Sequence, residues 1–430
     1  MNQSELYVSL DIGSSCIKVL IGEMNDNSLH VIGVGNVKSS GIRKGAIVDI
    51  EATVQSIKKA VSEAERMIGM SIHEIVLGIP ANLANVQNVK GVVAVNREDR
   101  EITDGDLERV IESAQVMSIP PERELINIVP KQFIVDHLEE IKDPRGMIGT
   151  RLEMDGTMMT TSKTILHNVL RCVERAGLQI REIYLQPLAG GYFALTEDEK
   201  NHGTAYVDIG GGSTTIAIFH EGHLINTSVI PVGGDHITKD LSIVLKTPTE
   251  QAEMIKIKYG HAFYDDASDD ELFEVPVIGA DMKEQYSQRY IAEIIGVRLE
   301  ELFELVLEEF YRMGLQDLPG GVVLTGGVSK LEGIGQLARH ILQTRVRLYT
   351  PDYIGVREPQ YTTAVGLIRY AYKEDLFYGK IGDSHALTQM VPNDIVTSTK
   401  KQKQAGHDTT NDNKVSAMTK AKKFFDKFFE

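Results

Sequence analysis

A short motif occurs twice in the chain, and this repeat constrains the fold more than any other feature of the sequence. The string DIGSS at residues 11–15 recurs as DIGGGS at residues 208–213, about half a chain later. Strand-like segments flank each copy, at 6–10 and 17–21 around the first and at 204–207 and 215–219 around the second. A repeated unit of strand, glycine turn and strand predicts two related α/β lobes.

Hydrophobic periodicity and turn residues divide the rest of the chain. Apolar residues recur at helical spacing over 51–68, 164–176, 249–259 and 290–313, whereas 84–162 reads as short strands with one helix at 104–116. We therefore expect a first lobe core of residues 1–83 and 163–202, completed by about 345–378, with an inserted subdomain at 84–162. The second lobe core is expected at 203–238 and 312–344, with a second insertion at 239–311. Residues 379–417 are polar and predict a flexible linker before a final helix at 418–430.

Charge and composition exclude several classes of protein. The formal net charge of the 430 residues is −16, and without a basic stripe this disfavours nucleic acid as a partner. The two cysteines, Cys16 and Cys172, are expected to be free thiols. The first ten residues lack the pattern of a signal peptide, and no apolar run reaches the roughly 18 residues of a membrane span. We expect a cytoplasmic protein whose membrane contact, if any, is peripheral.

The glycine turns are candidate phosphate sites. Such a turn lets backbone N–H groups converge on an anion, and neighbouring hydroxyl groups add donors. One copy alone is weak evidence, because Asp-x-Gly turns commonly end strands. Two copies with a third glycine turn at Gly326 and Gly327 favour a nucleotide. The expected donors are Ser14, Ser15, Gly211, Gly212, Ser213 and Thr214.

These three turns resemble the phosphate-1, phosphate-2 and adenosine motifs of the superfamily that contains actin, Hsp70 and the sugar kinases. The resemblance implies an actin-like two-lobed α/β fold that binds ATP between the lobes. It implies that Lys18 contacts phosphate, that Gly326 and Gly327 lie at the adenosine, and that Asp11 and Asp208 hold Mg²⁺ through water. The alternative for the two aspartates is turn capping.

Other residues carry further expectations from this resemblance. Lys239 and Lys256 lie in a region that borders the adenosine in the superfamily, although solvated helix lysines are the simpler interpretation. Cys16 stands where a small polar residue is usual. Gln186 takes the place of the residue that orients the attacking water, and its alternative is packing on Pro187. A glutamine amide does not titrate, so hydrolysis is expected to be slow at most.

The whole chain resembles the FtsA family of bacterial cell-division proteins. The resemblance rests on the position of the 84–162 insertion, on the tail, and on the strings KTILHN at 163–168, ERAG at 174–177 and LQPLA at 185–189. It implies an ATP-binding scaffold that tethers FtsZ to the membrane at the division septum, self-associates into actin-like protofilaments and recruits later division proteins through the first insertion. Arg298 matches a docking position for the acidic FtsZ tail, or else it forms an intrahelical ion pair. A pilus-assembly scaffold and a small-molecule kinase remain the alternatives.

The final segment has the pattern of an amphipathic helix. At helical spacing its apolar residues fall within an arc of about 140°, with the charged residues opposite. The apolar side consists of Met418, Ala421, Phe424, Phe425, Phe428 and Phe429. Residues 380–430 carry a net charge of +3 in an acidic protein. We expect this helix to bind anionic lipids on the cytoplasmic side of the cell membrane; the alternative is that it docks on the body of the protein.

Overall fold

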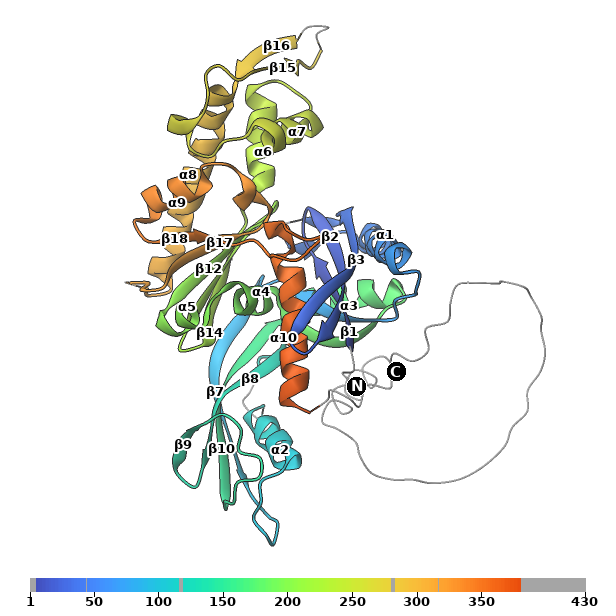
Figure 1. Ribbon diagram of the computed structural model, residues 1–430, viewed down its shortest axis with the longest axis vertical. Coiled ribbons are helices and arrows are strands. Elements are labelled where there is room, and N and C mark those ends of the chain that lie inside the picture. The colour runs from blue at the N-terminus through green and yellow to red at the C-terminus, as the bar shows by residue number, and fades with distance from the viewer. Residues whose placement is uncertain (1–4, 44, 116–118, 280–282, 316, 380–430) are drawn as a thin grey trace, which may run out of the picture. The chain divides into compact units, whose positions relative to one another are not determined.

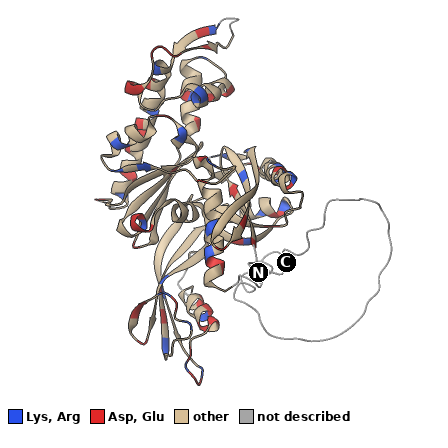
Figure 2. Cartoon of the chain, in the orientation of Figure 1, with Lys and Arg blue, Asp and Glu red and all other residues tan. Residues whose placement is uncertain are grey.

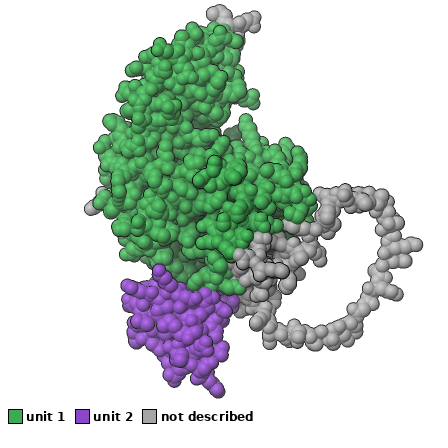
Figure 3. Space-filling view, in the orientation of Figure 1, with its two compact units in different colours: residues 1–89, 117–131, 155–391 green, residues 90–116, 132–154, 392–430 purple. Residues whose placement is uncertain are grey.

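The computed structural model describes residues 5–43, 45–115, 119–279, 283–315 and 317–379. Except for residue 379, the predicted linker and the amphipathic helix at 418–430 lie outside the described residues. The described chain forms two compact units (Figure 3). The first contains residues 5–89, 119–131 and 155–379, and the second contains residues 90–115 and 132–154.

The first lobe contains a five-stranded sheet. Its strands are β1 (Glu5–Ile12), β2 (Cys16–Asn25), β3 (Ser28–Lys38), β6 (Glu74–Ile79) and β11 (Gln179–Leu185). Their order is β11-β6-β1-β2-β3. β1 pairs antiparallel with β2 on one side and parallel with β6 on the other, and β11 pairs parallel with β6. The sheet thus begins as a meander and then gains parallel strands through helical crossovers.

The second lobe repeats this topology. Its strands are β12 (Thr204–Ile209), β13 (Thr214–His220), β14 (His223–Ile230), β17 (Gly321–Thr325) and β18 (Val346–Leu348), in the order β14-β13-β12-β17-β18. β12 pairs antiparallel with β13 and parallel with β17, as β1 does with β2 and β6. The duplication expected from the two motifs is therefore confirmed.

Helices α1 (Ile50–Ile68) and α3 (Lys163–Arg175) belong to the first lobe. The α1 helix begins where Asp49 accepts a hydrogen bond from the Ala52 N–H and ends at Gly69, whose φ of 71° suits glycine. The apolar side of α1 is buried, as its periodicity predicts; it contains Val54, Ile57, Ala60, Val61 and Ala64.

Two helices, α4 (Gln186–Ala194) and α10 (Thr362–Phe377), pack against each other next to both sheets (Figure 1). Their approach is close, because a Cβ on Gly366 would lie 2.4 Å from the carbonyl oxygen of Ala189. One end of α10 reaches the second lobe, where Thr363 donates to Asp208. At the other end, Asp375 accepts hydrogen bonds from Tyr7 at 2.9 Å and from Arg181 at 2.6 Å in the first lobe.

The remaining helices of the first unit pack on the second lobe and its insertion. They are α5 (Glu197–His202), α6 (Gly234–Val244), α7 (Thr249–Tyr259), α8 (Gln288–Arg312) and α9 (Ile334–Leu342), with the hairpin β15 (Leu272–Pro276) and β16 (Lys283–Ser287). Ile295, Leu299 and Phe303 of α8 are fully buried in one core that also contains strands β12 and β17. The predicted helices at 249–259 and 290–313 therefore match α7 and α8 closely.

The predicted insertion at 84–162 contains α2 (Asp104–Ala114) and a sheet in the order β7-β10-β8-β9. The strands are β7 (Asn85–Ala94), β8 (Arg123–Val135), β9 (Leu138–Ile141) and β10 (Arg151–Ser162). The second unit comprises α2, β9 and parts of β7, β8 and β10. Within the described ranges of the chain, no helix is long and apolar enough to cross a bilayer.

Candidate functional site

The two glycine turns have the same local geometry. The Gly13 N–H donates to the Cys16 carbonyl at 3.1 Å, and the Gly210 N–H donates to the Ser213 carbonyl at 3.0 Å. In each copy the aspartate lies at the end of the first strand and is paired in register with the second strand, Asp11 with Lys18 and Asp208 with Thr215. The repeated sequence thus folds into a repeated turn.

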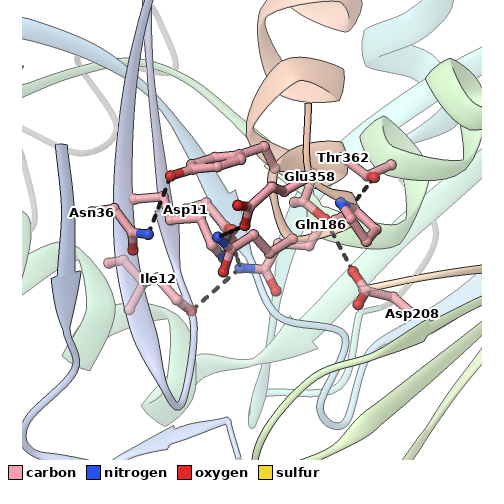
Figure 4. A network of polar contacts seen from close by, with 12 residues as sticks. Asp11, Ile12, Asn36, Gln186, Asp208, Glu358 and Thr362 are labelled. Carbon is pink, nitrogen blue, oxygen red and sulfur yellow. Dashed lines mark hydrogen bonds and ion pairs between the residues drawn. The ribbon is translucent and has the colours of Figure 1, made fainter. Parts of the chain in front are cut away.

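Asp11 is the centre of a buried polar cluster (Figure 4). Lys18 Nζ lies 3.0 Å from Asp11 Oδ2, and Gln186 Nε2 donates to Asp11 Oδ1 at 2.8 Å and to the Ile12 carbonyl at 3.3 Å. Burial lowers the pKa of Lys18, but Asp11, Cys16 and Asp208 raise it, and the net shift is upward, so that the ammonium stays charged. Three of the predicted site residues are therefore in contact.

Asp208 occupies the equivalent position in the second lobe. Thr363 Oγ1 donates to Asp208 Oδ2 at 3.3 Å, and burial raises the pKa of Asp208 to about 6. Lys18 lowers this pKa and Asp11 raises it, so both charges are close enough to act on Asp208. A nearby cation would stabilise the charged form of this buried carboxylate and lower its pKa.

The third glycine turn packs against Asp208. Gly326 has a φ of 90°, and a Cβ there would lie 2.2 Å from Asp208 Oδ1. At Gly327, by contrast, a Cβ would meet nothing within 4 Å. Only glycine can come this close to Asp208, because it has no Cβ. All three predicted turns therefore lie near the carboxylates of Asp11 and Asp208.

The two Asp-Ile-Gly turns face each other directly. A Cβ on Gly211 would lie 1.8 Å from Ser15 Oγ, and the same hydroxyl group donates to Asp235 Oδ1 at 3.4 Å. Ser14 Oγ accepts from the Gly45 N–H at 3.0 Å. Gly212 is buried and Ser213 is partly buried between these groups. The Thr214 hydroxyl group donates to the Val232 carbonyl at 2.9 Å and so supports the strand that follows.

Asp235 and Thr363 were missed by the sequence analysis. Asp235 lies in the first turn of α6, directly after Gly233 and Gly234, and Thr363 lies in the first turn of α10. The glycine pair directly before α6 was the sequence signal that could have indicated Asp235. Nothing in the sequence marks Thr363, because its partner Asp208 is 155 residues away.

The two predicted lysines on α6 and α7 have different environments. Lys256 is buried, and its ammonium donates to the Gly234 carbonyl at 3.1 Å and to Thr238 Oγ1 at 2.8 Å, with Glu253 at 2.6 Å. Lys239 is exposed on α6. The structure therefore brings Lys256, and not Lys239, to the N-terminus of α6 beside Asp235. Of the two lysines, only Lys239 fits the simpler interpretation of a solvated helix residue.

Arg298 on α8 is engaged within the protein. Its guanidinium holds both carboxylate oxygens of Asp240 on α6, at 2.6 and 3.2 Å, and also donates to Glu301 one turn along α8. The hydrogen bond with Asp240 raises the pKa of Arg298 further. The intrahelical pair considered from the sequence is present, together with a second carboxylate that the sequence did not indicate.

The residues of this site fit a hydrated magnesium ion better than a fully protein-coordinated metal. Among the described residues, no group of three or more histidine, cysteine or acidic side chains is arranged to hold a metal ion. Asp11 and Asp208 supply the carboxylate oxygens that Mg²⁺ prefers when it keeps most of its water. Both cysteines are free, as expected, and burial raises the pKa of Cys16, which keeps the thiol beside the first turn protonated.

Comparison with known proteins identifies the family. A model of "Cell division protein FtsA" matches residues 205–366, and a model of the "SHS2 domain inserted in FTSA" matches residues 82–160. The chain is 56% identical to the cell division protein FtsA of Bacillus subtilis over 383 residues, which cover 89% of this chain and 87% of the relative. It is 41% identical to FtsA of Enterococcus hirae over 450 residues, with 100% of both chains covered.

Solved structures support the fold. A PilM–PilN type IV pilus biogenesis complex matches with a TM-score of 0.58 at 17% identity, covering 84% of this chain and 97% of that chain. MreB5 of Spiroplasma citri bound to ADP matches with a TM-score of 0.53 at 14% identity, covering 87% and 98%. A MamK double helical filament matches with a TM-score of 0.51 at 14% identity, covering 85% and 98%. The fold is therefore actin-like, and the extent and identity of the curated matches show that this chain belongs to the FtsA family of cell division proteins.

Proposed function

We propose that this protein is an ATP-binding scaffold of cell division that tethers FtsZ filaments to the cytoplasmic face of the cell membrane. The observation that carries the nucleotide part is the pair of facing glycine turns with Asp11 and Asp208 behind them. Membership of the FtsA family supports the cell-division part. MreB5, which shares the fold, was solved with ADP bound, and this supports a nucleotide as the ligand.

ATP would bind with its phosphates between the two turns. The proposed donors are the backbone N–H groups of Gly211 and Gly212 and the hydroxyl groups of Ser14, Ser15 and Ser213, with Thr214 holding the second turn in shape. Lys18 would add charge, and Asp11 and Asp208 would hold the water shell of Mg²⁺. When bound, Mg²⁺ would neutralise phosphate charge. Gly326 and Gly327 would border the adenosine, with Lys256 nearby and Lys239 more distant.

Hydrolysis of ATP would be slow. Gln186 cannot take a proton at neutral pH, so its contribution is limited to orienting water. The hydrogen bond to Asp11 fixes the Gln186 amide in one direction. This supports a positioning role, and the activity proposed is a weak ATPase in a protein that acts mainly as a scaffold.

Different parts of the chain would bind different partners. The acidic tail of FtsZ would dock at Arg298, later division proteins would dock on the 84–162 insertion, and copies of the chain would assemble into protofilaments at the septum. The MamK filament, built on the same fold, supports self-association. The apolar face formed by Met418, Phe424, Phe425, Phe428 and Phe429 would enter an anionic membrane surface as a peripheral anchor.

Calorimetry of Mg-ATP binding tests the central claim. Gly212→Val should abolish binding, because a branched side chain fills the space that the phosphates require. Gly105→Val on α2 is the matched control, since a Cβ at Gly105 meets only Thr103 Oγ1, at 3.9 Å. Unchanged affinity in Gly212→Val would remove the nucleotide proposal. Asp208→Ala should weaken binding more with Mg²⁺ than with EDTA; an equal loss would assign Asp208 a structural role.

A further inference from the structure

A basic pocket lies apart from the nucleotide site, between the end of α4, α5 and α10. It has a volume of about 330 Å³, and its lining includes Tyr192, Phe193, Glu197, Lys200 and Arg369. The nucleotide, membrane and FtsZ sites proposed above use none of these residues. Aromatic rings and cations together in a concave site are a common basis for binding a charged small ligand.

Lys200 is built into this pocket. Its side chain is only 2% exposed, and its ammonium lies 4.1 Å from the centre of the Tyr192 ring. The carboxylate of Glu197 lies 2.6 Å from Lys200 Nζ, but the Glu197 side chain is 78% exposed. A buried ammonium is costly unless it is well compensated, and one exposed carboxylate is weak compensation.

A second lysine shares the same ring. Lys373 Nζ lies 4.1 Å from the centre of Tyr192 and 5.4 Å from that of Tyr370. Arg369 lies one turn before Lys373 on α10 and also donates to the Asn27 carbonyl. Figure 2 shows both basic and acidic residues on α10. The Tyr192 ring therefore contacts two ammonium groups, of which that of Lys200 lines the cavity together with Arg369.

The pKa shifts nearby have burial as their largest cause, with contributions from both cations and carboxylates. Burial lowers the pKa of Lys373, Glu374 raises it, Lys200 lowers it and Glu197 raises it, and the net shift is downward. Burial lowers the pKa of His223 to about 4, with further lowering by Lys131 and Lys373. The cations Lys131, Lys200, Arg369 and Lys373 outnumber the carboxylates Glu197, Glu221 and Glu374 by one.

We propose that this pocket binds a phosphomonoester, carried either by a soluble phosphate compound or by a lipid headgroup. A phosphate group carries negative charge and several acceptor oxygens, which suit the Lys200 ammonium and the Arg369 guanidinium in the lining. Arg369 offers a planar set of donors for phosphate oxygens, and Lys200 and Lys373 act as point charges. Phe193 and Leu195 in the lining supply apolar surface for the rest of the ligand.

Binding of inorganic phosphate to the full chain tests this site by calorimetry. Arg369→Gln/Lys373→Gln should weaken binding at the pocket about tenfold or more, because hydrogen bonds to charged groups are worth about that factor each. Lys283→Gln/Arg289→Gln is the matched control, since it removes the same charges from exposed pairs with Glu274 and Asp269. Mg-ATP binding of both double variants should equal that of the parent, which separates this site from the nucleotide site and shows that the variants fold.

Vesicles distinguish the two sources of phosphate. The full chain carrying Phe425→Glu, to silence the tail, is mixed with phosphatidylcholine vesicles that contain phosphatidic acid or the diester phosphatidylglycerol. Retention on phosphatidic acid that falls about tenfold in Arg369→Gln/Lys373→Gln assigns the pocket to a lipid headgroup. Phosphate binding that depends on Arg369 and Lys373 without such retention assigns it to a soluble compound. If neither phosphate nor phosphatidic acid binding responds to this double change, the proposal is overturned.

Discussion

Gln186 donates a 2.8 Å hydrogen bond from its side-chain amide to Asp11, so the residue that begins α4 is fixed to the aspartate that ends β1. Lys18 holds the other oxygen of the same carboxylate at 3.0 Å. Each oxygen of the Asp11 carboxylate therefore has a partner within the protein. Mg²⁺ would reach it through water, and the partners of Asp11 would stay in place.

Gln186→Ala should slow ATP hydrolysis about tenfold or more while leaving Mg-ATP affinity within about twofold, because the amide orients water and is not proposed to contact ATP. Phosphate release and calorimetry measure the two quantities. Equal hydrolysis rates in the variant and the parent would show that Gln186 only packs on Pro187.

Arg298→Glu should weaken binding of an FtsZ tail peptide at least tenfold, because it replaces a cation with an anion at the docking point. Asp240→Asn should strengthen the same binding, because it loosens the internal partner with which the peptide competes. Peptide titration by fluorescence anisotropy measures both effects, with Mg-ATP binding as the control. Loss of peptide binding in both variants would mean that the ion pair between Arg298 and Asp240 maintains the local structure and that Arg298 does not itself bind the peptide.

His223 should make the protein sensitive to acid. Its pKa in the folded protein, about 4, lies below its ordinary value of 6.5, so the neutral form stabilises the fold. This contribution is fully present above pH 6.5 and is lost as the pH falls towards 4. His223→Gln should therefore lose less thermal stability between pH 7 and pH 4.5 than the parent does. His30→Gln, at an exposed position, should behave as the parent; a parallel loss in all three proteins would contradict the prediction.

Phe425→Glu should release the full chain from anionic vesicles, with Mg-ATP binding unchanged. Burying one phenylalanine contributes about 1.5–3 kcal/mol, or roughly a tenfold to a hundredfold change in partition. Lys422→Gln, on the charged side, should weaken binding less, because one lysine near an anionic surface contributes about 1 kcal/mol. Vesicle flotation measures both. Equal flotation of Phe425→Glu and the parent would favour docking of the tail on the protein itself.

Local patterns predicted the parts of the fold that depend on nearby residues. The two turns and the helices α1, α7 and α8 follow from repeated strings and from apolar spacing within about 20 residues, and the structure confirms them. The partners of the functional side chains depend on tertiary contacts. Ser15 meets Asp235 across 220 residues, and Arg298 meets Asp240 across 58, so no local pattern indicated either pair. The burial of Lys256 could not be predicted from local sequence either. Its position on α7 is typical of a solvent-exposed helix lysine, whereas tertiary packing buries it.

Helix α10 links two distant polar contacts through a single rigid element. Thr363 at one end donates to the buried Asp208, and Asp375, about 18 Å along the axis, is held by Tyr7 and Arg181. Between them, Gly366 packs closely on the backbone of α4. A change at Asp208 that displaced Thr363 would therefore be transmitted along one helix to Tyr7 and Arg181, so that a contact in the second lobe and a contact in the first lobe cannot change independently.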